Sequence, residues 1–293
     1  TFPQQRAFVV SENKYDAAFC TRRSAKSFSG GTKLVYRALK YPGTNHLFTG
    51  LTRASAKGII WKDVLRVLDR RFGLNASFNQ TDLTMTLPNG SEIWATGIDA
   101  DEDEMKKVLG RKFKTAIIDE ASMYTINLHD FIYGVLAPAM TDDGGVINML
   151  GTASNFPRGL FFDITNGKEG GWGLHQWTAH DNPYVAKQWQ IALDEIAKNR
   201  PLYMQTPQFK QWFLNQWVLD AAQIVSRYAP VKNLTKDVPR LPHDGWAYVL
   251  GVDLGWEDDN AFVLTAYHVN DPHLYVVDSF AASVSATVAN DAA

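Results

Sequence analysis

The segment Cys20–Ser27 has most of the pattern of a loop that binds nucleotide phosphates. It reads CTRRSAKS, whereas the usual pattern is G-x-x-x-x-G-K-S/T, so Cys20 and Ala25 stand where the two glycines are expected. In such loops the backbone N–H groups surround the phosphates, the lysine reaches the β- and γ-phosphates and the hydroxyl binds Mg²⁺. Lys26 and Ser27 supply these groups. Cys and Ala are small, so the steric departure from glycine is modest.

Two further segments bear on this loop. Asp119 and Glu120 end the apolar segment TAIIDEAS, as required of a carboxylate that holds Mg²⁺ through water and a second one that activates the attacking water. Thr152 lies at the end of another apolar segment, MLGTASN, where its hydroxyl is suited to sensing a γ-phosphate. Taken singly, each feature has an ordinary alternative: helix capping for Lys26-Ser27, helix capping for the acidic pair, and a plain turn at Thr152. Together, the three features occur along the chain in the order that a P-loop ATPase requires, and this favours an ATP site.

These groups need a framework of alternating strands and helices. Apolar runs at 17–21, 46–52, 114–122 and 146–154 predict strands, and 83–97 predicts a hairpin around Pro88-Asn89-Gly90. The alternation favours an α/β sheet with ligands at the carboxyl ends of its strands. Helices are expected at 27–41 and 55–72. Their expected inward residues are Leu34, Val35, Ala38, Leu39, Ile60, Val64, Val67, Leu68 and Phe72.

The second half of the chain changes in character. From about residue 185 it becomes helical and rich in Trp, and 231–245 contains three prolines and little periodicity, which is typical of a linker. Three strands are expected after it, at 248–254, 261–268 and 274–280. The predicted organisation is an ATPase domain at 1–230 with a lid subdomain at about 181–230, a linker at 231–245, and part of a second domain at 246–293.

Composition limits the alternatives. The 293 residues are 45% hydrophobic and 20% charged, which favours packed domains over disorder. With a net charge of −2, any surface that binds nucleic acid must be local. The single cysteine excludes an internal disulfide framework. We expect no membrane span and no signal peptide, because no apolar stretch is long enough and the start TFPQQRAFVV lacks the required regions.

The segments FPQQRAFV, CTRRSAKS, FTGLTRASAK, IIDEAS, LGTASN, DNPY and LGVDLGWEDDNAFVL occur in an order that resembles the large terminase subunit of tailed bacteriophages. The resemblance covers nearly the whole chain. It implies an ASCE-type P-loop ATPase with a helical lid, followed by the truncated start of an RNase H-like nuclease. Implied cofactors are ATP and Mg²⁺, with Mg²⁺ or Mn²⁺ for the nuclease. Implied partners are double-stranded DNA, the small terminase subunit, the portal protein and other copies in a ring on the procapsid, in the host cytoplasm.

The same resemblance implies roles for residues of the phosphate loop. Members of this family often have arginines inside an altered loop, as at Arg22 and Arg23, and one of these would move with the γ-phosphate. Gln5 would bind the adenine. The residues expected to surround the nucleotide phosphates are Cys20, Thr21, Arg22, Arg23, Ser24, Ala25, Lys26 and Ser27.

Four further roles follow from the resemblance. Asp119 would position Mg²⁺ together with Ser27, and Glu120 would be the catalytic base. Gly151–Ala153 would couple hydrolysis to domain movement, with Ala153 departing from the family's usual Pro. Arg111 would act on the nucleotide of a neighbouring subunit, as an arginine finger that stabilises transition-state charge; the alternative is a surface arginine.

Asp253 is the expected metal ligand of the nuclease. It is the one acidic residue expected in the middle of the strand YVLGVDLG, and two-metal cleavage needs such a carboxylate together with others. Asp258 and Asp259 follow in a turn. In the family the remaining carboxylates come from later in the domain, so we expect this chain by itself not to cut DNA.

A basic stripe is expected on the helix at 55–72. Lys62, Arg66 and Arg70 recur at every fourth position, with Lys57 and Arg71 nearby, and such a stripe suits contact with DNA phosphates. An ordinary solvated helix face is the alternative.

Two other functions remain open on the sequence: a helicase or repair ATPase with an appended nuclease, and an assembly protein that binds ATP but hardly hydrolyses it.

Overall fold

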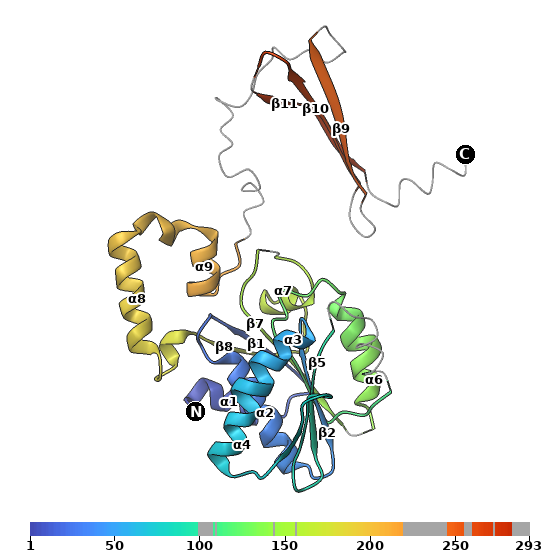
Figure 1. Cartoon of the computed structure of the whole chain (residues 1–293), viewed down its shortest axis with the longest axis vertical. Coiled ribbons are helices and arrows are strands. Elements are labelled where there is room, and N and C mark those ends of the chain that lie inside the picture. The colour runs from blue at the N-terminus through green and yellow to red at the C-terminus, as the bar shows by residue number, and fades with distance from the viewer. Residues whose placement is uncertain are drawn as a thin grey trace, which may run out of the picture. The chain divides into compact units, whose positions relative to one another are not determined.

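The computed structural model describes residues 1–98, 108, 110–142, 144–155, 157–218, 245–254, 260–271 and 273–282. The chain divides into two compact units, Thr1–Leu219 and Asp220–Ala293, and each is described by itself (Figure 1). Most of the predicted linker at 231–245 lies outside the described residues, so the predicted domain limits remain predictions.

The described part of the first unit contains an eight-stranded sheet in the order β3-β4-β5-β2-β6-β7-β1-β8. From β5 to β8 neighbouring strands are parallel, while β4 runs antiparallel to β5 and β3 antiparallel to β4. The carboxyl ends of β1, β6 and β7 therefore meet at one edge. The strands are β1 Tyr15–Cys20, β2 Asn45–Gly50, β3 Ser77–Asn79, β4 Thr84–Thr86, β5 Glu92–Gly97, β6 Thr115–Ile118, β7 Val146–Gly151 and β8 Gly173–Trp177.

Helices cover both faces of this sheet (Figure 1). The helices α1, α2 and α4 pack on one face, and the second π-helix and α7 pack on the other. The α-helices are α1 Pro3–Val10, α2 Lys26–Lys40, α3 Arg53–Ala56, α4 Arg66–Phe72, α6 Ala137–Ala139, α7 Leu160–Thr165, α8 Ala186–Asn199 and α9 Pro207–Leu214. Two π-helices, η1 Lys57–Leu65 and η2 Asp130–Leu136, and two 3₁₀ helices, η3 Ala179–Asp181 and η4 Pro201–Gln205, complete the unit's described helices.

Both faces of the central strands are apolar. Along β1, Ala18 and Cys20 belong to one hydrophobic core and Ala17 and Phe19 to the other, because successive side chains of a strand point to opposite faces. Strands buried on both faces give continuous apolar runs rather than alternation. This is the reason the predicted runs at 17–21, 46–52, 114–122 and 146–154 are confirmed as strands.

Helix α2 packs tightly on this sheet. A Cβ added at Gly30 would lie 2.7 Å from a methyl carbon of Leu150, and one added at Gly31 would lie 2.5 Å from a methyl carbon of Val64. Both distances are far below those of real Cβ contacts. Gly30 thus lets the first turns of α2, and with them Lys26, approach the strands closely, while Gly31 lets the π-helix Lys57–Leu65 approach α2.

Two expected inward residues are wrong. Leu39 is 49% exposed and Phe72 is 64% exposed. In α2 the buried face is rotated toward Lys33 and Arg37, which are buried because they pair with Asp16 and Glu12. Ahead of Phe72, the π-helix Lys57–Leu65 has more residues per turn than an α-helix, so the α-helical periodicity used for the prediction no longer holds at its end.

The second unit contains a three-stranded antiparallel sheet in the order β11-β10-β9 among its described residues. Its strands are β9 Trp246–Asp253, β10 Asn260–His268 and β11 Leu274–Ala282, which confirms the three predicted strands. Asp253 is the last residue of β9 and not a mid-strand residue as expected. No described helix of the chain is long and apolar enough to cross a membrane.

Candidate nucleotide site

The predicted phosphate loop joins β1 directly to α2. Cys20 is the last residue of β1 and Lys26 is the first residue of α2. Between them, Arg23 has φ +62° and Ala25 has φ +67°, a left-handed conformation that glycine adopts at no steric cost. Ala25 stands where the pattern has its second glycine, and it holds the backbone conformation that such a glycine would supply. The loop thus keeps a left-handed turn. For a residue with a Cβ, this conformation costs about 1–2 kcal/mol of free energy.

We expect Ala25→Gly to change the free energy of unfolding by less than about 1 kcal/mol, because relief of left-handed strain and the larger entropy of unfolded glycine nearly cancel. Ala25→Val should destabilise the chain by more than about 1–2 kcal/mol, because a β-branched residue is a genuine outlier at positive φ. Urea unfolding of both variants beside the wild type measures the difference. Equal unfolding midpoints for Val and Gly would contradict the left-handed conformation.

Neighbouring elements hold the loop from outside. The Ser24 hydroxyl donates to the Thr21 carbonyl (2.8 Å), the Trp177 indole donates to the Ser24 carbonyl (2.9 Å) and the Ala179 N–H donates to the Thr21 hydroxyl (2.8 Å). Cys20 is buried, and burial raises the pKa of its thiol. Thr21, Ser24 and Cys20 therefore shape the loop.

The acidic pair lies at the carboxyl end of β6. Asp119 follows the last residue of that strand, and the Glu120 Oε1 atom lies 2.6 Å from the Lys26 Nζ atom. The side chain of Lys26 is 11% exposed and that of Glu120 is 33% exposed. Glu120 has φ +57°, a costly conformation for a residue with a Cβ and one that tends to cluster at functional sites. The structure thus brings together two groups that are 94 residues apart.

The charges of this cluster influence one another. Burial alone would lower the pKa of Lys26, but the carboxylates of Asp119 and Glu120 outweigh it and raise this pKa. Burial raises the pKa of Asp119, the charge of Glu120 adds to this, and Lys26 and the Ser27 hydroxyl oppose it. Two carboxylates thus hold Lys26 in its charged form.

Asp119 also fits a metal ligand. Its Oδ1 atom accepts from the Glu120 N–H (3.0 Å), while its Oδ2 atom is buried and, among the described residues, has no hydrogen-bond partner. The Ser27 hydroxyl is near enough to lower the pKa of Asp119. An unpartnered buried carboxylate oxygen beside a hydroxyl suits Mg²⁺, which proteins hold through one or two carboxylates and substrate phosphates.

The tip of β7 lies beside the acidic pair. The Thr152 Oγ1 atom is buried and has no hydrogen-bond partner among the described residues. The Thr152 carbonyl accepts from the Ser122 hydroxyl (2.7 Å), and the Ser154 hydroxyl donates to the Ser122 carbonyl (3.0 Å). These bonds tie the loop after Glu120 to the loop that contains Gly151–Ala153. Sequence reasoning missed Ser122 and Ser154.

Three other predicted ligand residues also have protein partners. The Gln5 amide nitrogen donates to the Ser29 hydroxyl of α2 (2.9 Å), and Gln5 is buried. The Arg22 guanidinium lies over the Trp212 ring. Arg23 is exposed, and its carbonyl accepts from the Asn182 side chain.

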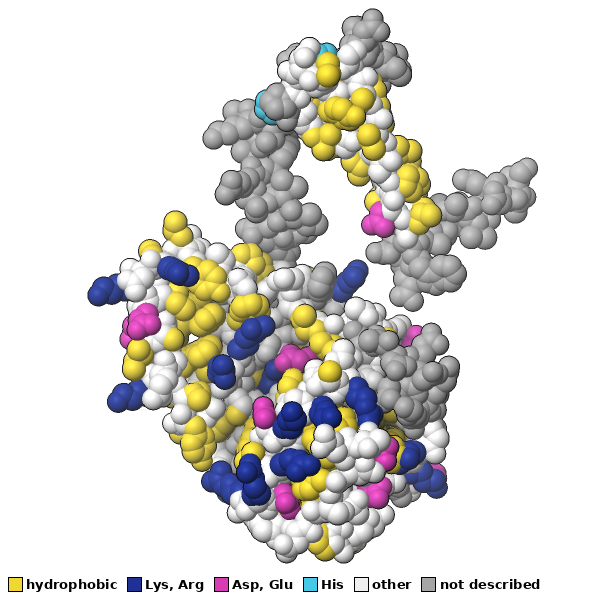
Figure 2. Space-filling model, in the orientation of Figure 1, with side chains coloured by type: hydrophobic (Ala, Val, Ile, Leu, Met, Phe, Trp, Pro, Cys, Tyr) yellow, Lys and Arg dark blue, Asp and Glu magenta, His cyan; other side chains and the backbone are white. Residues whose placement is uncertain are grey.

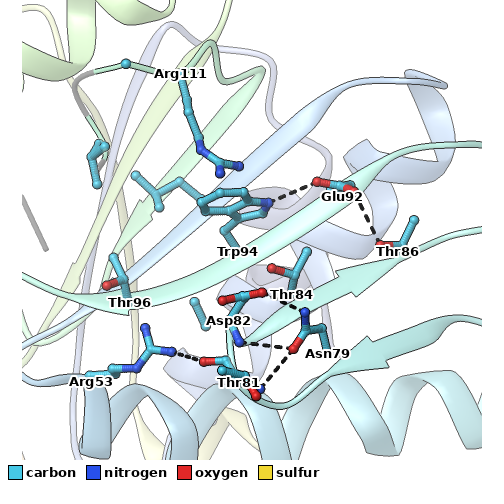
Figure 3. A pocket seen from close by; sticks show the side chains of 14 residues that line it. Arg53, Asn79, Thr81, Asp82, Thr84, Thr86, Glu92, Trp94, Thr96 and Arg111 are labelled. Carbon is cyan, nitrogen blue, oxygen red and sulfur yellow. Dashed lines mark hydrogen bonds between the residues drawn. The ribbon is translucent and has the colours of Figure 1, made fainter. Parts of the chain in front are cut away.

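Arg111 lies in the segment before β6, away from the phosphate loop. It covers the ring of Trp94 on β5, whose indole donates to Glu92 (3.1 Å) (Figure 3). Both side chains line a cavity of about 1040 Å³ that includes no residue of the phosphate loop or the acidic pair. Three strands lie between β5 and β1. The two strands are therefore four spacings of 4.8 Å apart, or about 19 Å. The structure does not bring Arg111 to the nucleotide site of its own chain.

The predicted basic stripe is exposed. Lys62, Arg66 and Arg70 all face solvent, and Figure 2 shows Lys and Arg side chains gathered on the face of the first unit that carries α2 and α4. The Arg66 guanidinium also lies 4.7 Å from the centre of the Phe78 ring, so part of this stripe covers apolar surface.

Asp253 belongs to the second unit. It is exposed at the carboxyl end of β9, opposite Ala261 of β10. Asp258 and Asp259 lie outside the described residues. In the described part of the chain, no group of three or more His, Cys, Asp or Glu side chains is arranged to hold a metal ion.

No protein-family model matches the sequence, and no curated protein sequence matches it. Solved structures do match. The large terminase of a thermophilic bacteriophage aligns with 99% of this chain and 72% of its own length, at a TM-score of 0.61 and 16% identity. That protein has also been solved in complexes with ADP and with ATP-gamma-S.

Two other phage proteins have the same fold. The large terminase ATPase domain of Thermus phage P74-26 aligns with 74% of this chain and 94% of its own length, at a TM-score of 0.54 and 18% identity. The HK97 bacteriophage large terminase aligns with 96% of this chain and 62% of its own length, at a TM-score of 0.54 and 17% identity. The chain therefore has an α/β fold of the kind found in terminase ATPases. The resemblance inferred from the sequence is confirmed for the fold, and the functional roles belong to the proposal that follows.

Proposed function

We propose that this chain is an ATP-hydrolysing motor of the large-terminase type, which moves double-stranded DNA. The observation on which this rests is the cluster formed by Lys26, Asp119 and Glu120, with a 2.6 Å ion pair between Lys26 and Glu120. It lies where the ends of β1, β6 and β7 meet, which is where α/β sheets bind their ligands.

The sheet order supports an ASCE-type ATPase. Strand β7, which carries Thr152 at its tip, lies between β1 and β6. The phosphate loop and the acidic pair are thus separated by one strand, and a γ-phosphate bound by Lys26 would lie next to Thr152. The Thr152 hydroxyl has no hydrogen-bond partner among the described residues, so it is available to contact this phosphate.

Each side chain has a role that its surroundings favour. The backbone of Cys20–Ala25 and the Lys26 ammonium bind the β- and γ-phosphates. Ser27 and Asp119 would hold Mg²⁺, which when bound would supply positive charge against the developing charge on the phosphates. Glu120 orients the attacking water and accepts its proton. To do so it must first leave Lys26, which turns to the nucleotide.

Arg111 is proposed to act on a neighbouring copy. Its place over Trp94, about four strand spacings of 4.8 Å from β1, removes it from the phosphates of its own chain. An assembly in which β5 of one copy faces the phosphate loop of the next would bring it there, as in a ring.

The remaining parts of the proposal rest on the likeness to terminases. They include packaging of viral DNA into a procapsid, with a portal protein and a small terminase subunit as partners, and a nuclease of the RNase H type. The antiparallel order β11-β10-β9 with Asp253 at the end of β9 is compatible with the start of such a nuclease. DNA phosphates would contact the exposed stripe of Lys62, Arg66 and Arg70.

Nucleotide binding and hydrolysis by wild type and Lys26→Ala test the ATPase. We expect the wild type to bind ATP-γ-S with Mg²⁺ and to hydrolyse ATP in the presence of double-stranded DNA. Lys26→Ala should lose at least about tenfold in affinity, because a charged hydrogen bond to phosphate contributes about 1.5–3 kcal/mol. Lys187→Ala, an exposed change on α8, is the control. Equal binding by all three proteins would refute the proposal, and binding without any hydrolysis would favour the assembly protein.

A further inference from the structure

Helix α9 contacts the phosphate loop directly. The Arg22 N–H donates to the Trp212 carbonyl (3.3 Å), and the Arg22 guanidinium carbon lies 3.7 Å from the centre of the Trp212 ring. A guanidinium at this distance from a ring face is held by cation–π attraction. The phosphate loop is therefore bound to α9 through both the backbone and the side chain of one arginine.

The same helix is bound to the loop after β7. The Gln211 amide donates to the Ser154 carbonyl (2.9 Å), and Gln211 is only 2% exposed. Next to α9, the Asn215 side chain accepts from the Ala153 N–H (3.3 Å). Helix α9 thus connects the two loops that border the proposed nucleotide site, and its position is fixed with respect to the tip of β7.

Further anchoring comes from the residues after α9. The Trp217 ring stacks on Phe19 of β1 at 5.6 Å and an angle of 11°, and its indole donates to the Thr165 hydroxyl (2.9 Å). Like Trp217, Trp212 is only partly buried. Its removal would leave the anchors of α9 in place.

Arg22 has a stronger partner available than a ring. Its side chain is exposed, and within the described part of the chain no carboxylate is paired with it. It lies four residues before Lys26, in the loop that would surround the phosphates. Because charge-assisted hydrogen bonds to phosphate are stronger than neutral ones, a terminal phosphate above this loop would compete with Trp212 for the guanidinium.

We infer that Trp212 is a positioning residue that holds Arg22 away from the nucleotide until a γ-phosphate takes the guanidinium. This rests on the proposed function, since it requires a triphosphate above Lys26. The competition is specific to the γ-phosphate, so ATP and ADP should respond differently when the ring is removed. Since α9 is fixed to the loop after β7, release of Arg22 also loosens the link between that loop and the phosphate loop.

Binding of ATP-γ-S and ADP to Trp212→Ala and Trp212→Phe tests this inference. Loss of a partly exposed cation–π contact should tighten ATP-γ-S binding by about two- to fivefold in Trp212→Ala, with ADP binding unchanged. Trp212→Phe keeps a ring and should bind both ligands nearly as the wild type does. In an Arg22→Ala background, Trp212→Ala should have no further effect. Weaker ATP-γ-S binding, an equal change for ADP, or the same change without Arg22 would each overturn the inference.

A second measurement needs no nucleotide. The tryptophan fluorescence that is lost in Trp212→Phe reports on this ring, and Arg22→Ala should make that component more accessible to acrylamide. Unchanged accessibility would mean that the stack does not form, and would overturn the inference while leaving the proposed ATPase intact. Conversely, a chain with the stack that binds no nucleotide at all would remove the proposed function, and with it the role of the stack.

Discussion

Glu120→Gln is expected to lower ATP turnover by about 10²–10⁴-fold, the usual contribution of a general base, while ATP binding is kept. Glutamine has nearly the shape of glutamate but accepts no proton. The change also removes the carboxylate that lies 2.6 Å from the Lys26 Nζ atom, so Lys26 becomes freer to bind phosphate. Single-turnover hydrolysis and equilibrium binding of ATP separate these two effects.

The matched control for this variant is Glu195→Gln, an exposed change on α8 that should leave both quantities unaltered. A second comparison is Asp119→Asn, in which Mg²⁺-dependent binding should weaken because the buried ligand oxygen is lost. Turnover by Glu120→Gln within a fewfold of the wild type would show that another group serves as the base.

Arg111→Ala is expected to lower ATP turnover of the assembled protein by about 10³–10⁵-fold, the range for loss of an arginine finger. Single chains that bind ATP without assembling should hardly differ from the wild type, because Arg111 lies over Trp94 and away from its own phosphate loop. Turnover measured at increasing protein concentration, with DNA present, distinguishes the two states.

Mixing two inactive variants provides the sharper test of Arg111. In an equal mixture of Arg111→Ala and Glu120→Gln, about a quarter of the interfaces in a head-to-tail ring would join an intact Glu120 to an intact Arg111. Turnover should therefore rise above that of either variant alone. Arg111→Lys, which keeps the charge but loses the planar fork, should stay impaired, and Arg200→Ala, an exposed change, should not. A mixture as inactive as its components would refute action between copies.

The strands were predictable from the sequence because each central strand is buried on both faces and reads as an unbroken apolar run. The groups that end these runs, Lys26 after β1 and Glu120 after β6, were predictable for the same reason. Topology decides which strand ends are neighbours, and parallel strands with crossover helices place all their carboxyl ends at one edge.

Helix faces were less predictable. Hydrophobic periodicity assumes that buried residues are apolar, whereas Lys33 is fully buried in α2 with Asp16 as its partner. Burial lowers the pKa of Lys33 to about 8, although the charge of Asp16 opposes this. Such a pair can be recognised only when both partners are known, and they are 17 residues apart in different elements.

The contacts that surround the site were not predictable either. The segment that contains Trp212 and Trp217 was recognised as helical and rich in Trp, but nothing in its periodicity indicates that one ring meets Arg22 and the other meets Phe19. Its hydrogen bonds to the loops come from the Gln211 and Asn215 side chains and the Trp212 carbonyl, but their partners in the loops are backbone groups, which leave no mark on residue type. Contacts of this kind can be recognised only in the folded chain.

The ion pair between Lys26 and Glu120 has a consequence for the order of events at the site. While the two side chains hold each other, the cation is unavailable to stray anions and the carboxylate is unavailable to water. Under the proposed function, a nucleotide that offers Lys26 more negative charge than Glu120 does would separate the pair and free the base at the same moment. The base would then be blocked whenever the site holds no nucleotide, and it would be blocked again each time the product leaves.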